Sequence, residues 1–202
     1  MKAREILSIV VLALGLTAAM FPNKKNDSIA LTEREMLQQM LLESNYVSVD
    51  ELAGLLINGD PSIRLIDVRH ANEFKDAVPG AINIPIDSIF SENYAYLFDQ
   101  FLVKNIIYSN DDRLSTQVWM MTRQLGYANN YLLKGGLKAW NSTILDPQYP
   151  RLSASQDELD LYEKRMASRQ YFTGAKALPQ VDFIPMAPVG GKKKKRIAGG
   201  CS

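Results

Sequence analysis

The sequence predicts an α/β fold in which a parallel sheet lies between two layers of helices. Short runs rich in branched apolar residues, at 63–68, 105–109 and 130–133, have the composition of buried parallel strands. Segments with the apolar spacing of helices alternate with these runs, and such alternation is typical of a three-layer sandwich with a parallel sheet.

The chain begins with a basic stretch followed by 16 residues without charge, at 6–21. As a helix this run would be roughly 24 Å long, whereas a bilayer core is about 30 Å thick. It fits either a long signal peptide or a short anchor, so we assign residues 1–22 to export or membrane anchoring. We expect the domain to be extracytoplasmic, although basic residues on both sides of the run leave its orientation open.

Residues 23–45 are interpreted as a linker followed by an amphipathic helix. Thr32 and Glu35 form a capping box, and the spacing that follows predicts one apolar helical face with four members, Met36, Leu37, Met40 and Leu41. This face is predicted to be core, with a partner or membrane contact as the alternative.

The main domain is expected to span residues 46–145. Ser48 and Glu51 predict a capped helix, Pro79-Gly80 predicts a turn before the strand AINIP, and residues 87–102 are predicted to be mostly helical. A helix over 115–125 should turn four side chains inward, namely Val118, Trp119, Thr122 and Leu125.

A glycine pair, Gly135-Gly136, permits a tight turn into a last helix that Trp140 anchors in the core. Residues 146–189 then predict a helical extension and a proline-rich tether. Ser155 and Glu158 begin the extension's helix, Gly174 ends it, and three of its side chains could pack on the domain, namely Leu159, Tyr162 and Met166.

Residues 190–202 form a basic, flexible tail that ends near Cys201. The body between residues 26 and 191 holds 14 basic and 21 acidic residues, which does not fit a nucleic-acid binder. The basic groups gather at the chain ends, so we expect the tail to meet anionic lipid or a protein partner through Lys192, Lys193, Lys194, Lys195 and Arg196.

The chain has one cysteine and one histidine, His70. An internal disulfide is therefore impossible, and we expect no metal site and no cofactor. Five cations precede Cys201 and favour its thiolate. This thiol is either incidental, a lipid attachment point, a mixed-disulfide partner or a mobile carrier of sulfur.

Three stretches together resemble a rhodanese (sulfurtransferase) domain. They are LIDVRHANEFKDAVPGAINIP at 65–85, NIIYSNDDRLST at 105–116 and NYLLKGGLKAW at 130–140. The resemblance covers roughly residues 46–145 and implies a rhodanese-like fold. In that family the loop after the central strand begins with a cysteine that carries sulfur as a persulfide, and this chain has Ser109 there.

The resemblance identifies an altered active-site loop with seven members, Ser109, Asn110, Asp111, Asp112, Arg113, Leu114 and Ser115, the last opening a helix. Family loops present backbone N–H groups and a helix N-terminus to an anion. Here the hydroxyl of Ser109 is a poor nucleophile without a base. Two carboxylates stand where an anionic sulfur donor would approach, the usual glycine is missing, and Leu114 takes a basic position.

Asp67 and Arg69 also match the family, and we expect them to hold the loops above the sheet by hydrogen bonds and an ion pair. His70 follows them at the same end of the sheet and is the one candidate base for a hydrolase reading of Ser109. No G-x-S-x-G elbow surrounds that serine, so a solvated loop histidine is the favoured interpretation. Phosphatases that share the fold need the missing cysteine too.

These observations favour a membrane-associated, catalytically inactive rhodanese-like domain that acts as a binding or scaffold module. The main alternative is a sulfurtransferase or sulfur carrier that uses Cys201. A third interpretation is a sensor whose acidic loop binds a cation or a basic peptide.

Overall fold

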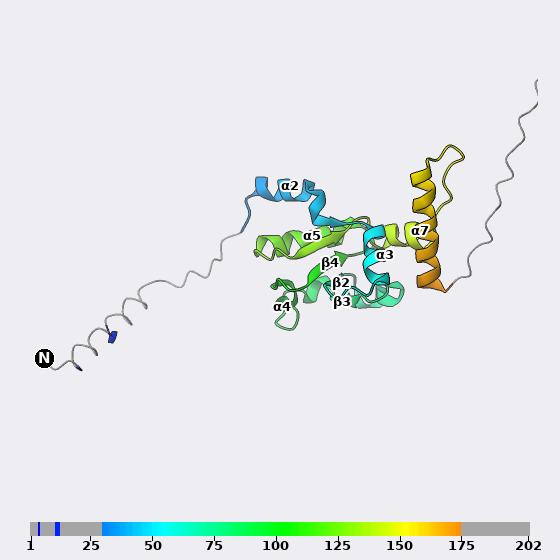
Figure 1. Ribbon diagram of the computed structural model, residues 1–202. Helices are drawn as coiled ribbons and strands as arrows, with labels where there is room; N and C mark the ends of the chain where they lie inside the picture. Colours follow the sequence, from blue (N-terminus) through cyan, green and yellow to red (C-terminus); the bar gives the residue numbers. More distant parts are fainter. Residues whose placement is uncertain (1–3, 5–10, 13–29, 175–202) are drawn as a thin grey trace, which may run out of the picture.

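The computed structural model describes Arg4, residues 11 and 12, and residues 30–174 (Figure 1). The predicted tether and basic tail lie outside these residues, as does most of the predicted signal or anchor. Within the described ranges, no helix is long and apolar enough to cross a bilayer.

The centre of the domain is one parallel sheet of five strands in the order β1-β5-β4-β2-β3 (Figure 1). The three predicted strands are confirmed, whereas the strand expected at AINIP is reduced to two residues. The strands are β1 (Tyr46–Val47), β2 (Ile63–Asp67), β3 (Ile82–Asn83), β4 (Lys104–Tyr108) and β5 (Asn130–Leu133). In this register Asp67 on β2 lies opposite Tyr108 on β4 and Asn83 on β3.

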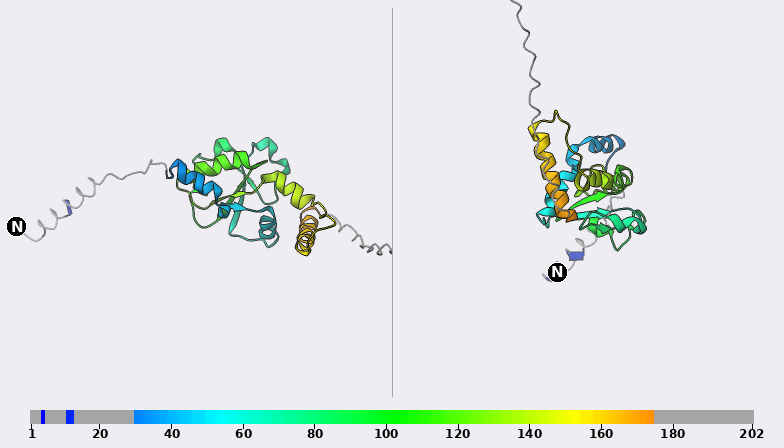
Figure 2. Two further views of the ribbon diagram at one scale, coloured as in Figure 1. Left: turned by 90° about the horizontal axis from the view of Figure 1, so that it is seen from above. Right: turned by 90° about the vertical axis from the view of Figure 1, so that its right-hand side faces the viewer.

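Helices cover both faces of the sheet, because consecutive strand residues point to opposite sides. Leu65, Ile106 and Leu133 pack toward α3 (Val49–Ile57) and α6 (Gly136–Trp140). Their strand neighbours pack on the other face, toward α5 (Asp112–Gln124) and α4 (Ala95–Phe98). Figure 2 shows α5 and α3 on opposite sides of the sheet, which confirms the predicted three-layer α/β fold.

The first described helix of the domain region is α2 (Glu33–Leu41), and it has the predicted capping box of Thr32 and Glu35. Met36 is buried against Trp119, but Leu37 and Leu41 are exposed. The prediction that four residues share one buried face is therefore wrong for Leu37 and Leu41. Successive helical positions are about 100° apart, and only the stripe that holds Met36 and Met40 meets the core.

The long helix predicted over residues 87–102 is also wrong. The segment forms a 3-10 turn, η3 (Ile86–Ser88), and the single turn of α4. Polar side chains satisfy the backbone locally instead: Ser91 Oγ donates to the Ser88 carbonyl over 2.7 Å, and Gln100 Oε1 accepts from the N–H of Val103 over 2.9 Å. Such bonds compete with continuous helix.

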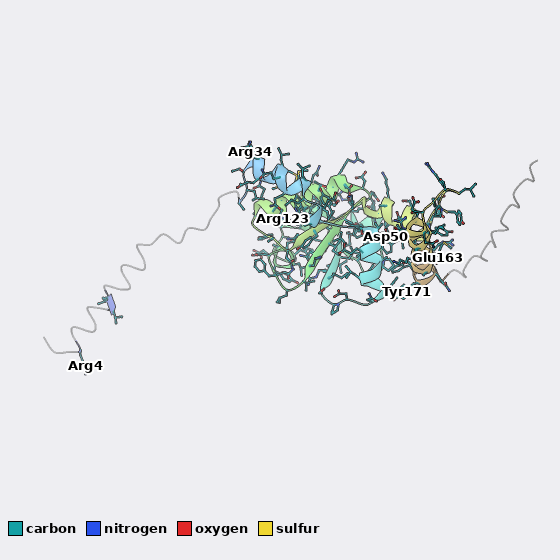
Figure 3. The ribbon with its side chains drawn as sticks, turned by 45° about the horizontal axis from the view of Figure 1, so that its top comes forward. Arg4, Arg34, Asp50, Arg123, Glu163 and Tyr171 are labelled. Atoms are coloured by element: carbon teal, nitrogen blue, oxygen red, sulfur yellow. The ribbon has the colours of Figure 1, made fainter. Side chains whose placement is uncertain are left out.

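The C-terminal extension forms α7 (Gln156–Thr173), which begins at the Ser155 capping box and ends at Gly174, as predicted. It packs on α3 and on a π-helical turn, η4 (Asn141–Leu145). Arg165 pairs with Asp50 of α3 over 2.7 Å, and Figure 3 shows Asp50 beside α7. The ring of Phe172 meets that of buried Trp140 with centroids 4.9 Å apart. Half-buried Leu159, Tyr162 and Met166 lie along the same helix.

Candidate active site

The candidate site lies beyond the carboxyl end of β4, between β5 and β2. This is the edge at which open parallel sheets hold ligands. The loop that follows β4 is shorter than predicted, because α5 begins at Asp112 and not at Ser115. Asp111 is the N-cap, and its carboxylate accepts the N–H of Arg113 over 3.1 Å.

The hydroxyl of Ser109 is hydrogen-bonded within its own loop and the start of α5. Ser109 is only 2% exposed. Its Oγ donates to the carbonyl of Asp111 and accepts from the N–H of Ser115 over 3.2 Å. The Ser115 hydroxyl lies a further 3.5 Å from that Oγ. These partners occupy both the proton and a lone pair of the hydroxyl.

The candidate base His70 does not contact Ser109, and the neighbouring phenol of Tyr108 is bonded elsewhere. His70 is exposed at the start of a 3-10 turn, η2 (Ala71–Asp76). The hydrogen bonds that the structure gives to the Ser109 hydroxyl involve Asp111 and Ser115, and none reaches His70. The buried phenol of Tyr108 accepts the N–H of Val78 over 3.1 Å, and burial beside Asp67 raises its pKa above the ordinary value.

Two carbonyls of the loop backbone point at α6. The N–H of Leu137 donates to the Ser109 carbonyl over 2.9 Å, and the N–H of Lys138 donates to the Asn110 carbonyl over 3.0 Å. Gly136 has a φ of 58°, and a Cβ there would lie 2.5 Å from the Ser109 carbonyl oxygen. Two carbonyls of the loop thus cap the first turn of α6.

Both acidic residues of the loop have partners in the chain. Asp111 pairs with Arg113 over 2.9 Å and with Lys138 over 3.5 Å. The hydrogen bonds from Arg113 are the main cause that lowers the pKa of Asp111 to about 2. Asp112 Oδ1 accepts the N–H of Gly135 over 2.7 Å. The two carboxylates of the loop are therefore paired with cations or hydrogen-bonded within the chain.

The remaining loop residues differ in exposure. The Arg113 side chain is largely exposed, while half-buried Leu114 packs against the cluster that contains Val118. Leucine at this position therefore supports the core under α5.

A buried ion pair braces this edge of the sheet. Arg69 binds Asp67 over 2.6 Å, and the side chains are 5% and 0% exposed. Hydrogen bonding to Asp67 raises the pKa of Arg69 above its ordinary value. Arg69 Nη1 also donates to Asn110 Oδ1 over 3.2 Å, so the pair reaches the loop. Sequence reasoning missed Asn83, whose amide donates to the carbonyls of Asp67 and Arg69 and joins the third strand to them.

In the described part of the chain, no three His, Cys, Asp or Glu residues are grouped so that they could hold a metal ion. The predicted thiol site at Cys201 and the five cations at 192–196 lie outside the described residues.

Comparison with known proteins gives one family match, to the rhodanese-like domain, over residues 48–143. A probable molybdopterin-synthase adenylyltransferase from Pyropia yezoensis is 30% identical over 102 residues, which are 50% of this chain and 26% of that protein. The chain thus spans about a quarter of the length of this relative.

Solved structures with a similar fold include a single-domain sulfurtransferase from Saccharomyces cerevisiae, at 23% identity and a TM-score of 0.40, which covers 48% of this chain and 89% of that one. The rhodanese-like domain of an Anabaena protein is 24% identical, with a TM-score of 0.42 and coverages of 55% and 88%. A possible tyrosine phosphatase from Rhodopseudomonas palustris is 16% identical, with a TM-score of 0.46 and coverages of 57% and 93%. The family match covers residues 48–143, and the structure has the parallel sheet described above. The chain therefore contains a domain of the rhodanese-like family, and that domain has no cysteine.

Proposed function

We propose that this protein is a membrane-associated binding or scaffold module whose rhodanese-like domain transfers no sulfur. The observation that carries the proposal is the state of Ser109, whose hydroxyl is buried and bonded to Asp111 and Ser115. A serine oxygen cannot hold sulfur as a persulfide, and without a base it is a poor nucleophile. The site therefore supports recognition better than group transfer.

The rigidity of the loop edge supports a binding role. Asp67, Arg69 and Asn110 form one connected group, and the carbonyls of Ser109 and Asn110 are hydrogen-bonded to α6. A surface held in this way loses little conformational freedom when a partner binds it. The exposed groups that it offers are those of Arg113 and Lys138, beside the rim carboxylate of Asp111.

Membrane association is the second part of the proposal. It rests on the uncharged run at residues 6–21 and on the five cations at 192–196, which suit an anionic leaflet. The run would tether the domain outside the cytoplasm, and the tail would add an electrostatic contact with lipid or with a protein.

A thiocyanate assay tests the absence of sulfur transfer. The full chain and its Cys201→Ser variant would be incubated with thiosulfate and cyanide. We expect both to match the rate without enzyme. Turnover in Cys201→Ser well above that rate would overturn the proposal, because no thiol would remain to explain it.

The same assay addresses a second candidate, sulfur transfer by Cys201, which is favoured by its position as the chain's single thiol close to five cations. Its thiolate would attack the sulfane sulfur of thiosulfate, breaking the S–S bond and releasing sulfite with the electron pair. Cyanide would then take the outer sulfur of the persulfide as thiocyanate and regenerate the thiolate. Activity in the full chain that disappears in Cys201→Ser would select this candidate.

A further inference from the structure

We propose that one edge of the domain, formed at the amino ends of β4 and β5, docks on the phospholipid surface of the bilayer that holds residues 6–21. We call it the apolar edge and define it by Phe90, Phe101, Leu102, Met121 and Leu125, all exposed. The inference rests on the membrane association proposed above and adds the orientation of the domain.

A groove of about 770 Å³ opens along α5 beside the segment that leads into α4. Its walls are mostly apolar and include Met120, Met121 and Leu125 from α5, Phe90 and Ala95 from the facing segment, and Tyr127. Phe90, Met121 and Leu125 at its rim are 43%, 45% and 54% exposed, so the groove presents apolar surface to the outside.

A loop tip lies at the same edge. Phe101 and Leu102 precede β4 and are 76% and 92% exposed. Asn129, two residues after groove-lining Tyr127, donates through its side-chain amide to the Val103 carbonyl over 2.6 Å. This bond ties the loop that carries Phe101 and Leu102 to the segment after α5.

The chain joins the domain at this edge as well. The N–H of Ala30 donates to the carbonyl of Gln124, a groove-lining residue, over 3.0 Å. Residues 22–29 connect this point to the uncharged run, and eight residues span at most about 29 Å when fully extended. If residues 6–21 insert, the apolar edge is therefore kept close to the bilayer in every molecule.

Lipid suits this surface better than a diffusing protein does. Exposed aromatic and leucine side chains partition into the boundary between headgroups and acyl chains. The tether supplies the surface at high effective concentration without a further encounter. Ser109 lies beyond the opposite end of β4, so docking of the apolar edge would leave the loop edge directed away from the membrane.

The test uses the full chain in phosphatidylcholine vesicles, with the native thiol removed by Cys201→Ser. Three variants, Leu12→Cys, Leu102→Cys and Leu152→Cys, each receive an environment-sensitive NBD label. Leu12 reports insertion of the uncharged run, Leu102 reports docking, and Leu152 is the matched control because it is 89% exposed, against 92% for Leu102. Spin-labelled lipids serve as the quencher.

We expect spin-labelled lipid to quench label 102 at least about twofold more strongly than label 152, and to quench label 12 as well. Quenching at 12 with equal, low quenching at 102 and 152 would overturn the docking proposal while insertion stands. Low quenching at all three positions would overturn insertion and docking together.

The same labels separate lipid from other occupants of the apolar edge. A change in the fluorescence of label 102 that occurs with native membranes but not with pure lipid would assign the edge to a protein and overturn the lipid proposal. A change that rises with the ratio of protein to lipid would assign the edge to a second copy of the chain and also overturn it.

Discussion

The backbone N–H of Ser115 points at the side-chain oxygen of Ser109 over 3.2 Å, from the first turn of α5. A cysteine at position 109 would keep this donor, which favours a thiolate. The loop carbonyls would still face α6, and the side chain would stay buried. One feature of a reactive thiol site is thus present, and the access that it needs is missing.

We therefore expect Ser109→Cys, made with Cys201→Ser, to restore little thiosulfate turnover. Its thiol should react with a disulfide reagent far more slowly in the native protein than in urea, because position 109 is buried. Adding Asp111→Gly and Leu114→Arg should raise turnover, since glycine frees the loop backbone and arginine supplies a cation. Robust turnover by the single variant would show that the loop is more open than its hydrogen bonds indicate.

Loss of Arg69 should destabilise the domain strongly. Arg69→Ala leaves Asp67 as a buried charge without its partner, so we expect the free energy of unfolding to fall by about 3–5 kcal/mol. Arg165→Ala breaks a pair that is about one-third exposed and should cost less than about 1 kcal/mol. Urea denaturation of both variants measures the contrast, and equal losses would contradict the role of burial.

The charge of Asp111 should make stability depend on acid pH. Its pKa of about 2 lies below the ordinary 3.8, so the ionised carboxylate stabilises the fold above pH 4. That contribution is lost as the pH falls toward 2. Asp111→Asn keeps an N-cap side chain but has no charge. The melting temperatures of the two proteins should differ at pH 6 and converge near pH 2, and a difference that stays constant with pH would exclude this charge as the cause.

Two glycines with positive φ offer a test of the contact between the loop and α6. Gly136→Ala and Gly59→Ala both place alanine near a φ of 60°, which costs about 1–2 kcal/mol. Only at Gly136 does the new Cβ meet backbone, at 2.5 Å from the Ser109 carbonyl oxygen, and such overpacking adds about 1–3 kcal/mol. Chemical denaturation should rank Gly136→Ala as the less stable variant, and equal stabilities would show that the loop yields freely.

The tail should bind anionic lipid through its charge. A peptide of residues 190–202 should bind phosphatidylserine vesicles with about 1 kcal/mol per cation at low salt, and binding should weaken as salt screens the charges. A matched peptide in which Lys192–Arg196 are glutamine should not bind. Binding that does not change with salt concentration would contradict an electrostatic role of the tail.

Local sequence patterns predicted the parts of the fold that depend on burial. The branched runs at 63–68, 105–109 and 130–133 form strands, since a central parallel strand is apolar on both faces. Val118, Trp119 and Thr122 point inward as the helical spacing predicted. The inward position predicted for Leu125 is wrong: this residue is the C-cap of α5 and is 54% exposed at the rim of the groove along that helix.

The candidate site was predictable in its residues and less so in its geometry. The motif located the loop and the pair of Asp67 and Arg69. The bond from Ser109 to the Asp111 carbonyl and the contact with Gly136 depend on loop conformation and on a helix 27 residues further along the chain. No local spacing contains that information.

The outermost strands of the sheet, β1 and β3, are two residues long each. Short edge strands offer few unpaired backbone groups on which another chain could add a strand. Confinement of many copies to one membrane plane would raise their collision rate, and sheets with long open edges would aggregate there. If the protein is held at a membrane as proposed, the short edges of this sheet would limit strand-to-strand association between neighbouring copies.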